Sequence, residues 1–107
     1  MDKRKSQIIK KLKAFKKLAN KEIAPINHMY FFGSRASGKP HKDSDIDLIV
    51  VSRKFQGKGH LERSPKLYVK WNLDYPVDFL CYTPKEFNKL KNQVSIVREA
   101  VSNGIKI

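Results

Sequence analysis

Two short apolar runs separated by a small-residue turn place the strongest constraint on how this chain can fold. Residues 26–32 and 45–52 each have the length and apolar content of a buried strand, and the first run ends at Gly33 and Ser34. Asp45 and Asp47 open the second run, and their spacing of two residues directs both side chains to the same side of a strand. The chain is therefore expected to place two carboxylates together where one strand begins.

The remaining patterns predict an α+β fold, a small mixed β-sheet with helices packed mainly on one face. A third strand is expected at residues 77–82, after Pro76, and a short one at 105–107. Helical spacing and good helix formers predict helices at residues 2–20, 65–73, 83–92 and 95–102. The stretch 53–64 is polar and contains two glycines, which predicts a mobile loop.

Two of these helices carry clear local signals. In the N-terminal helix, the apolar residues Ile8, Leu12, Phe15 and Ala19 share one face, and lysines occupy the opposite face. The sequence Thr-Pro-Lys-Glu at residues 83–86 has a threonine suited to an N-cap, a proline at the first helical position and a glutamate at the third. We expect the first helix to pack its apolar stripe on the core.

The length of the chain predicts one small domain. A sequence of 107 residues with 40% hydrophobic residues is enough for a single core. We expect one domain over residues 1–107, with a basic N-terminal helix at 1–22 and the core at 26–107. No apolar run approaches the length of a membrane span and no signal-peptide pattern opens the chain, which favours a cytoplasmic protein without a membrane partner. Cys81 lies in an apolar run and is expected to be a buried thiol.

The charge of the chain is strongly positive. Lys and Arg number 23 against 10 Asp and Glu, which gives a formal net charge of +13. Such a charge favours acidic partners, namely nucleic acid, nucleotides, an acidic protein or an anionic membrane surface. Much of the excess is lysine, and lysine-rich surfaces also serve solubility and thermal adaptation. Charge alone does not choose between these interpretations.

Three carboxylates on two strands form the candidate metal site. Asp78 lies in the third strand and would join Asp45 and Asp47 if that strand is the neighbour of the second. Carboxylates held together repel one another unless a cation neutralises them, and oxygen ligands are those that Mg²⁺ prefers. A pair of magnesium ions held in this way can activate an attacking oxygen and stabilise a leaving pyrophosphate.

The turn after the first strand is the candidate phosphate site. Gly33 lets the main chain approach a phosphate closely, and Ser34 adds a hydroxyl at the expected start of a short helix. Arg35 could pair with a phosphate oxygen or with a neighbouring acid, and Ser44 could bond the loop or a metal-bound water. A Gly-Ser pair and an Asp-x-Asp pair are each commonplace alone, but together with Asp78 they favour phosphoryl-transfer chemistry.

Other candidate chemistry is sparse. The three histidines, His28, His41 and His60, show no metal-ligand spacing and are expected on the surface or in loops. There is no P-loop and no glycine pattern for a dinucleotide.

The spacing of these residues resembles a known signature. GSRASG at residues 33–38, followed by SDIDL at 44–48, is similar to the signature of the polymerase-beta-like nucleotidyltransferase superfamily. The likeness is greatest for its minimal nucleotidyltransferase (MNT) branch of small prokaryotic proteins, and PVDF at 76–79 and TPKEF at 83–87 extend it toward the end of the chain. The resemblance implies the palm fold of that superfamily, with residues 26–107 as its catalytic core.

The resemblance also implies a function. It assigns Asp45, Asp47 and Asp78 as magnesium-binding catalytic carboxylates, and Gly33 and Ser34 as the residues that hold a nucleoside triphosphate. It implies transfer of AMP from ATP to a hydroxyl acceptor. Many MNT proteins act as the antitoxin of a HEPN-type toxin and adenylylate one of its tyrosines.

Alternatives to that function remain open. The protein could neutralise a toxin by binding alone, or transfer a nucleotide to RNA or to a small molecule. Because the chain is too short to carry its own acceptor domain, we expect a partner protein or a second copy to supply the acceptor.

Overall fold

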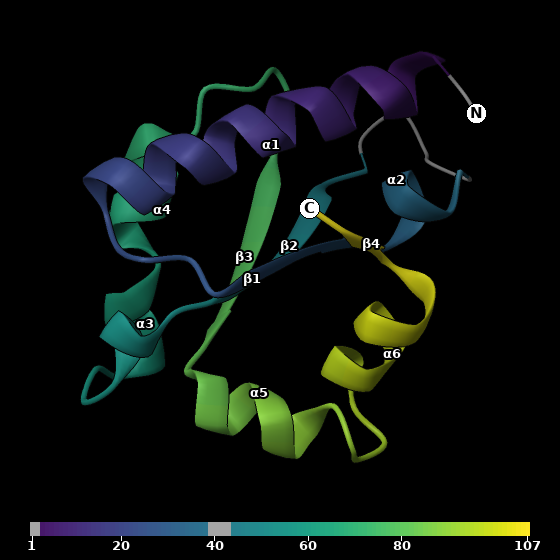
Figure 1. Ribbon diagram of the computed structural model, residues 1–107. Helices are drawn as coiled ribbons and strands as arrows, with labels where there is room; N and C mark the ends of the chain where they lie inside the picture. Colours follow the sequence, from purple (N-terminus) through teal and green to yellow (C-terminus); the bar gives the residue numbers. More distant parts are fainter. Residues whose placement is uncertain (1–2, 39–43) are drawn as a thin grey trace.

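The structure is a computed structural model that describes residues 3–38 and 44–107. A four-stranded sheet lies between helices (Figure 1), and its strands are ordered β3 (Val77–Tyr82), β2 (Ile46–Val51), β1 (His28–Phe32) and β4 (Ile105–Lys106). The long helix α1 (Lys3–Glu22) covers one face, and α5 (Pro84–Leu90) and α6 (Ile96–Asn103) cover the other. The predicted α+β class with a mixed sheet is thus confirmed.

Strand directions decide which strand ends meet. β1 is antiparallel to both β2 and β4, whereas β2 and β3 are parallel. The carboxyl end of β1 therefore lies beside the amino ends of β2 and β3. Both strands predicted at 77–82 and 105–107 form, the first with the predicted bounds.

The helices differ in placement from the prediction, because they cover both faces of the sheet rather than mainly one. Every residue of β2 from Leu48 to Val51 is buried. Leu48 and Val50 pack under α1, while Ile49 and Val51 pack against α5 and α6. A strand that is buried on both faces needs helices on both, since either uncovered face would expose apolar side chains to water.

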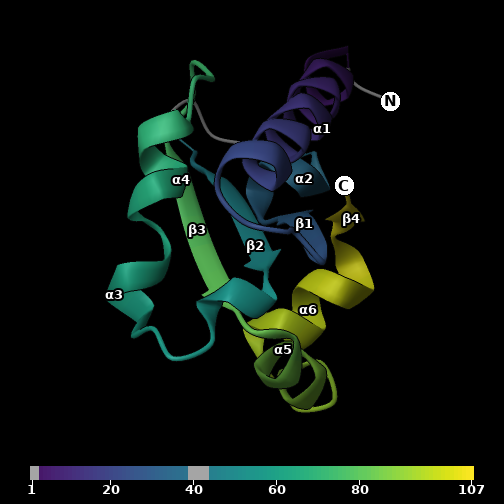
Figure 2. The ribbon, with the colours of Figure 1, turned by 60° about the vertical axis from the view of Figure 1, so that its left-hand side comes forward.

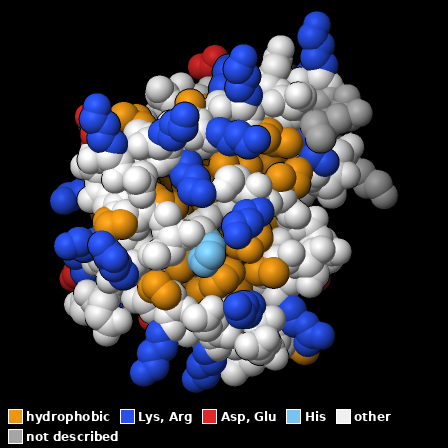
Figure 3. Space-filling view, viewed as in Figure 1, with side chains coloured by type: hydrophobic (Ala, Val, Ile, Leu, Met, Phe, Trp, Pro, Cys, Tyr) orange, Lys and Arg blue, Asp and Glu red, His pale blue; other side chains and the backbone are white. Residues whose placement is uncertain are grey.

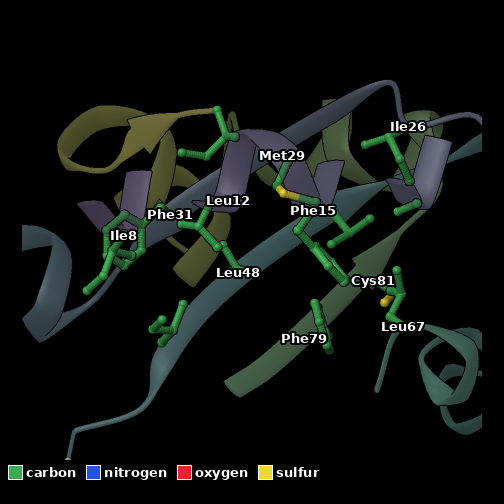
Figure 4. Packing of buried hydrophobic residues seen from close by; sticks show 14 of the residues in the cluster. Ile8, Leu12, Phe15, Ile26, Met29, Phe31, Leu48, Leu67, Phe79 and Cys81 are labelled. Carbon is green, nitrogen blue, oxygen red and sulfur yellow. The ribbon is translucent and has the colours of Figure 1, made fainter. Parts of the chain in front are cut away.

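The core under α1 has the predicted composition (Figure 4). The four residues of its apolar stripe, Ile8, Leu12, Phe15 and Ala19, are all buried. Within this stripe, the ring centroid of Phe15 lies 5.2 Å from that of Trp71 and 5.8 Å from that of Phe79. These ring contacts tie α1 to β3, and Figure 2 shows the helix lying across the sheet.

The segment 53–64, predicted as a loop, contains two short helices. A 3₁₀ turn, η1 (Arg53–Phe55), buries Phe55, and α3 (His60–Arg63) precedes α4 (Pro65–Lys70). The prediction failed because the segment is held by a partner that is distant in the sequence. The guanidinium of Arg63 donates to the carboxylate of Glu86 at 2.6 Å and to the main-chain oxygen of Cys81 at 3.2 Å.

Several local predictions are confirmed. Glu86 and Thr83 form the expected capping box at the start of α5, with Glu86 N donating to Thr83 Oγ1 at 3.2 Å. Ser95 caps α6, and Gly104 follows its last residue.

Helix α4 differs from the prediction at its end, because it stops at Lys70 rather than at about residue 73. Cys81 is buried, and this burial raises the pKa of its thiol to about 12. In the described ranges no helix is long and apolar enough to cross a membrane.

Candidate active site

Two acids on adjacent strands lie beside one turn where β1 ends and where β2 and β3 begin, and a third acid precedes β2. The strand register pairs Phe32 with Asp47, and Asp47 with Asp78. Neighbouring strands are about 4.8 Å apart, so the two aspartates lie side by side on adjacent strands. Asp45 precedes β2 by one residue and lies two residues from Asp47. The structure thus brings together the residues that the sequence predicted to be close.

Gly33 is required where β1 turns toward Asp47. Its φ angle is +85°, in the region that favours glycine, and a Cβ atom added to it would collide with Oδ2 of Asp47. The same Cβ would lie 3.2 Å from the Cγ atom of Asp47. The carboxylate of Asp47 therefore occupies the space that a side chain at position 33 would need. The turn at Gly33 and the carboxylate of Asp47 are therefore in direct contact.

The short helix α2 (Ser34–Ser37) continues the turn. Gly33 is its N-cap residue, and no side chain caps the helix start. The turn is closed behind by the main-chain N–H of Ser37, which donates to Gly33 O at 3.0 Å, and by its hydroxyl, which donates to Ser34 O at 3.0 Å. An uncapped first turn leaves main-chain N–H groups that an anion can accept from.

The electrostatics of the site favour a bound cation. Burial raises the pKa of Asp47, and the negative charges of Asp78 and Asp45 raise it further. The two neighbouring charges thus destabilise the ionised form of Asp47, and a cation would relieve that repulsion. Among the described residues, no three His, Cys, Asp or Glu side chains are gathered into a site that could hold a metal by themselves. Asp47 and Asp78 are two carboxylates on adjacent strands, and magnesium is commonly held by one or two carboxylates together with substrate phosphates.

Arg35 braces the chain that leads into β2. Its Nε donates to the main-chain oxygen of Ser44 at 2.6 Å, and its guanidinium lies 4.6 Å from the ring centroid of Tyr75. Arg35 therefore links α2 to the residue that precedes Asp45 and stacks on the segment before β3. The expected contacts of Arg35 with phosphate and of Ser44 with metal-bound water stay predictions. Tyr75 is a site neighbour that no local sequence pattern indicated.

A hollow opens beside the turn on the side of α6. It has a volume of about 380 Å³ and is lined by Phe32, Gly33, Ser37, Ile96, Glu99, Asn103 and Gly104. No local pattern in the sequence indicated this hollow, because α6 is brought to β1 only by the fold. Val94 precedes α6 and Ile96 is its first residue, and both apolar side chains are exposed. The hollow could receive part of a substrate next to Gly33.

Neither of the two described histidines lies at this site. His60 is exposed on α3, as expected for a surface residue, and His41 lies outside the described residues. His28 differs from the prediction because it is half-buried at the start of β1, at the end of the strand opposite Gly33.

The mixed sheet and its flanking helices define a fold of the nucleotidyltransferase type. The sequence profile of the nucleotidyltransferase domain matches residues 6–107, so the chain belongs to that family. Membership supports a transferase activity, and it confirms the nucleotidyltransferase part of the predicted resemblance. No curated protein matches the chain.

Two solved structures are similar to this one. A protein from Sulfolobus solfataricus, provisionally assigned as a nucleotidyltransferase, has a TM-score of 0.64 at 22% identity over 84% of this chain and 79% of its own. A toxin–antitoxin structure with AMP-PNP has a TM-score of 0.55 at 24% identity over 95% of this chain and 70% of its own. At these identities the similarity establishes the fold alone.

Proposed function

We propose that this protein transfers AMP from ATP to a hydroxyl acceptor in a magnesium-dependent reaction. The observation that carries the proposal is the contact of the Asp47 carboxylate with the main chain at Gly33, next to Asp78 on the neighbouring strand. A phosphate held at the turn would lie beside these carboxylates. Asp45, Asp47 and Asp78 are the proposed metal ligands and catalytic residues, and Gly33 and Ser34 are the proposed triphosphate contacts.

In this reaction the acceptor oxygen forms a bond to the α-phosphorus of ATP, and the bond from that phosphorus to the bridging oxygen breaks. Pyrophosphate leaves, and the hydroxyl proton passes to solvent. Magnesium, when bound, neutralises phosphate charge and makes the acceptor oxygen more nucleophilic. The residues of this chain hold the reactants in line, with the carboxylates fixed by β2 and β3 and the phosphates by the turn.

The proposed acceptor is a tyrosine hydroxyl of a HEPN-type toxin partner, which this protein would inactivate as an antitoxin. Support comes from the similarity to a toxin–antitoxin structure that contains AMP-PNP. It also comes from the open hollow beside Gly33 and the exposed Val94 and Ile96, which leave the site accessible to a second protein. Cationic small-molecule acceptors fit less well, because the net charge of +13 would repel them.

The direct test uses ATP labelled at the α-phosphate, magnesium and the product of the adjacent gene. We expect label on a tyrosine of that partner with the wild-type protein and at least a ~100-fold lower rate with Asp47→Asn, because the variant loses a metal ligand and a charge. Asp74→Asn is the matched control, since Asp74 is an exposed acid outside the cluster and its loss should leave the rate unchanged. Equal labelling by wild type and Asp47→Asn would contradict the proposed site.

A second arm separates catalysis from binding. If Asp45→Asn with Asp47→Asn still neutralises the partner fully in cells, the protein acts by complex formation and the proposed adenylylation is wrong. If neutralisation is lost while the complex still forms in pull-down, catalysis is required.

A further inference from the structure

A second surface lies at the end of β1 opposite the acids. We call it the lysine hollow. It has a volume of about 420 Å³ and is lined by Lys13, Lys16, Lys17, Asn20, Ile26 and Ile107. Ile26 precedes β1 and Gly33 follows it, and four residue steps of about 3.3 Å place the two strand ends about 13 Å apart. The lysine hollow is therefore distinct from the proposed catalytic site.

Lysines from two further positions of the fold converge beside this hollow. The pKa of His28 is lowered by its burial and then by the charges of Lys106, Lys16 and Lys91. Lys106 lies in β4, Lys16 in α1, and Lys91 directly follows α5 as its C-cap. We call the lysine hollow together with Lys91 and Lys106 the lysine face. Figure 3 shows Lys and Arg side chains gathered over α1 and around an exposed apolar patch, with few acidic side chains on that side.

The lysine face also carries aromatic rings. The ring of His28 stacks on that of Phe87 at 5.4 Å, and Tyr30 stacks on the same ring at 5.8 Å. The ammonium of Lys91 lies 5.9 Å from the Phe87 ring centroid. Nδ1 of His28 is buried and has no hydrogen-bond partner within the described part of the chain. A buried polar atom without a partner is costly to the folded state.

Protein stability accounts for one of these lysines in part, because Lys16 Nζ donates to the main-chain oxygen of Ile107 at 2.8 Å and ties α1 to the residue after β4. Within residues 3–38 and 44–107, only Lys70 among the lysines forms an ion pair, with Glu22 at 3.8 Å. Along α1, Lys10, Lys13 and Lys17 follow one another at spacings of three and four residues, and such like-charge pairs destabilise a helix by about 0.2–0.5 kcal/mol each. Thermal adaptation works through networks of paired charges, which this face lacks. Apart from Lys16, the lysines of this face form no ion pair within the described residues, so their charges are open to an external anion.

The chemistry of the face selects the kind of anion. All its cations are lysines, whose compact ammonium groups bind phosphates as point charges without the bidentate geometry of arginine. The floor of the hollow is apolar at Ile26 and Ile107, which suits a base or a sugar between phosphates. Helix α1 extends the row of charges over about 30 Å, the length of its 20 residues.

We propose that the lysine face binds single-stranded nucleic acid through its phosphodiester backbone. Phosphates lie against the lysines of α1, β4 and the end of α5, and bases pack on the apolar floor and the neighbouring rings, as in other sequence-tolerant single-strand sites. This binding does not depend on the proposed adenylyl transfer, because it uses the other end of the sheet.

The test measures fluorescence anisotropy of a labelled 20-nucleotide oligouridylate as salt is varied. With about four phosphates neutralised, log K should fall against log salt with a slope of about −3, or roughly 50-fold from ~50 mM to ~200 mM. The triple variant Lys13→Gln, Lys16→Gln, Lys17→Gln should bind at least ~10-fold more weakly and reduce the slope by about 2. An oligodeoxythymidylate of the same length should bind with similar affinity, because the backbone charge is shared.

Matched variants make the result specific to this face. Lys54→Gln, Lys58→Gln, Lys66→Gln removes the same net charge from exposed positions on η1, the next turn and α4, and should lower affinity less than ~3-fold. If the α1 triple variant has lost helical circular dichroism, Lys91→Gln with Lys106→Gln tests the same face without changing α1. Asp47→Asn should bind the oligonucleotide as wild type does, which separates this proposal from the catalytic one.

Three results would overturn the proposal. One is the absence of binding at ~50 mM salt. Another is an equal loss of affinity in the control triple variant, which would mean that net charge alone is responsible. The third is displacement of the oligonucleotide by polyglutamate at equal charge concentration, which would identify an acidic protein as the occupant of the face.

Discussion

Replacement of Gly33 by alanine should damage stability and catalysis together, through one contact. At φ +85° and ψ −166° the main chain adopts a conformation that is almost restricted to glycine and costs about 1–3 kcal/mol for other residues. In addition, the new methyl group would meet Oδ2 of Asp47 and force that carboxylate to move. A clash of this kind in a packed site costs about 1–3 kcal/mol more.

The clash can be separated from the strain with a matched glycine. Gly38 also has a positive φ of 84°, but a Cβ added there meets nothing within 4 Å. Gly38→Ala should therefore lose about 1 kcal/mol from the left-handed conformation, after the unfolded-state gain of about 0.4–1 kcal/mol. Gly33→Ala should lose about 2 kcal/mol more than that, which corresponds to a melting temperature roughly 8 °C lower than that of Gly38→Ala.

A double-mutant cycle then assigns the excess to Asp47. With Asp47→Ala in place, the methyl group at position 33 has room, so Gly33→Ala should cost about 2 kcal/mol less than it does beside the aspartate. Urea denaturation of the four proteins measures this coupling. In the wild-type background, adenylyl transfer by Gly33→Ala should fall about 100-fold, because a displacement of about 1 Å at a reacting centre has that effect. Coupling below about 0.5 kcal/mol, or a rate equal to that of Gly38→Ala, would refute the reasoning.

Three further predictions concern other contacts. Hydrogen bonds from Arg63 lower the pKa of Glu86 to about 2, so the stabilisation they provide is complete above the ordinary pKa of 4.5 and is lost as pH falls through 2. After a discount for the partial exposure of Glu86, the Glu86→Gln variant should lose about 2 kcal/mol of unfolding free energy near neutral pH in urea titrations, and little near pH 2. The pKa of about 12 predicts that Cys81 resists iodoacetamide in the native protein at pH 8 and reacts in urea, as mass spectrometry would show. Arg35→Lys should lose the bond to Ser44 and lower kcat about tenfold without changing the melting temperature by more than about 4 °C; an unchanged kcat would exclude a bracing role.

The sequence predicts well those features that are decided by neighbours in the chain. The capping box at Thr83 and Glu86 and the apolar stripe of α1 are local patterns, and both are present as expected. The helix α3 was missed because Arg63 finds its partner 23 residues away, and no local pattern reveals that. Burial of β2 on both faces was in principle visible, since its unbroken run of apolar residues is typical of a strand covered on both sides.

The candidate site shows the same division. The spacing of Asp45 and Asp47 predicted that they lie together. Asp78 was expected to join them if the third strand neighbours the second, and the register of β2 and β3 meets that condition. The contact between Gly33 and Asp47 could not be predicted, because it depends on how β1 and β2 align. The role of Arg35 was also open, since the position of Tyr75 is set by the fold.

The two proposed surfaces stand at opposite ends of β1, and that separation makes their relation measurable. The α1 lysines of the hollow lie at the far end of β1, about 13 Å of strand from the acids, which exceeds the Debye length of about 8 Å at physiological salt. These lysines should therefore change the rate of adenylyl transfer to a protein acceptor only weakly. Asp47→Asn should then abolish transfer and keep oligonucleotide binding, while the α1 triple variant should do the reverse. If the triple variant instead loses transfer to the partner protein, the lysine face must contact that partner, and its surface should carry the matching acidic residues. If RNA added to the reaction itself becomes labelled, the acceptor is RNA, because the two surfaces then hold one substrate.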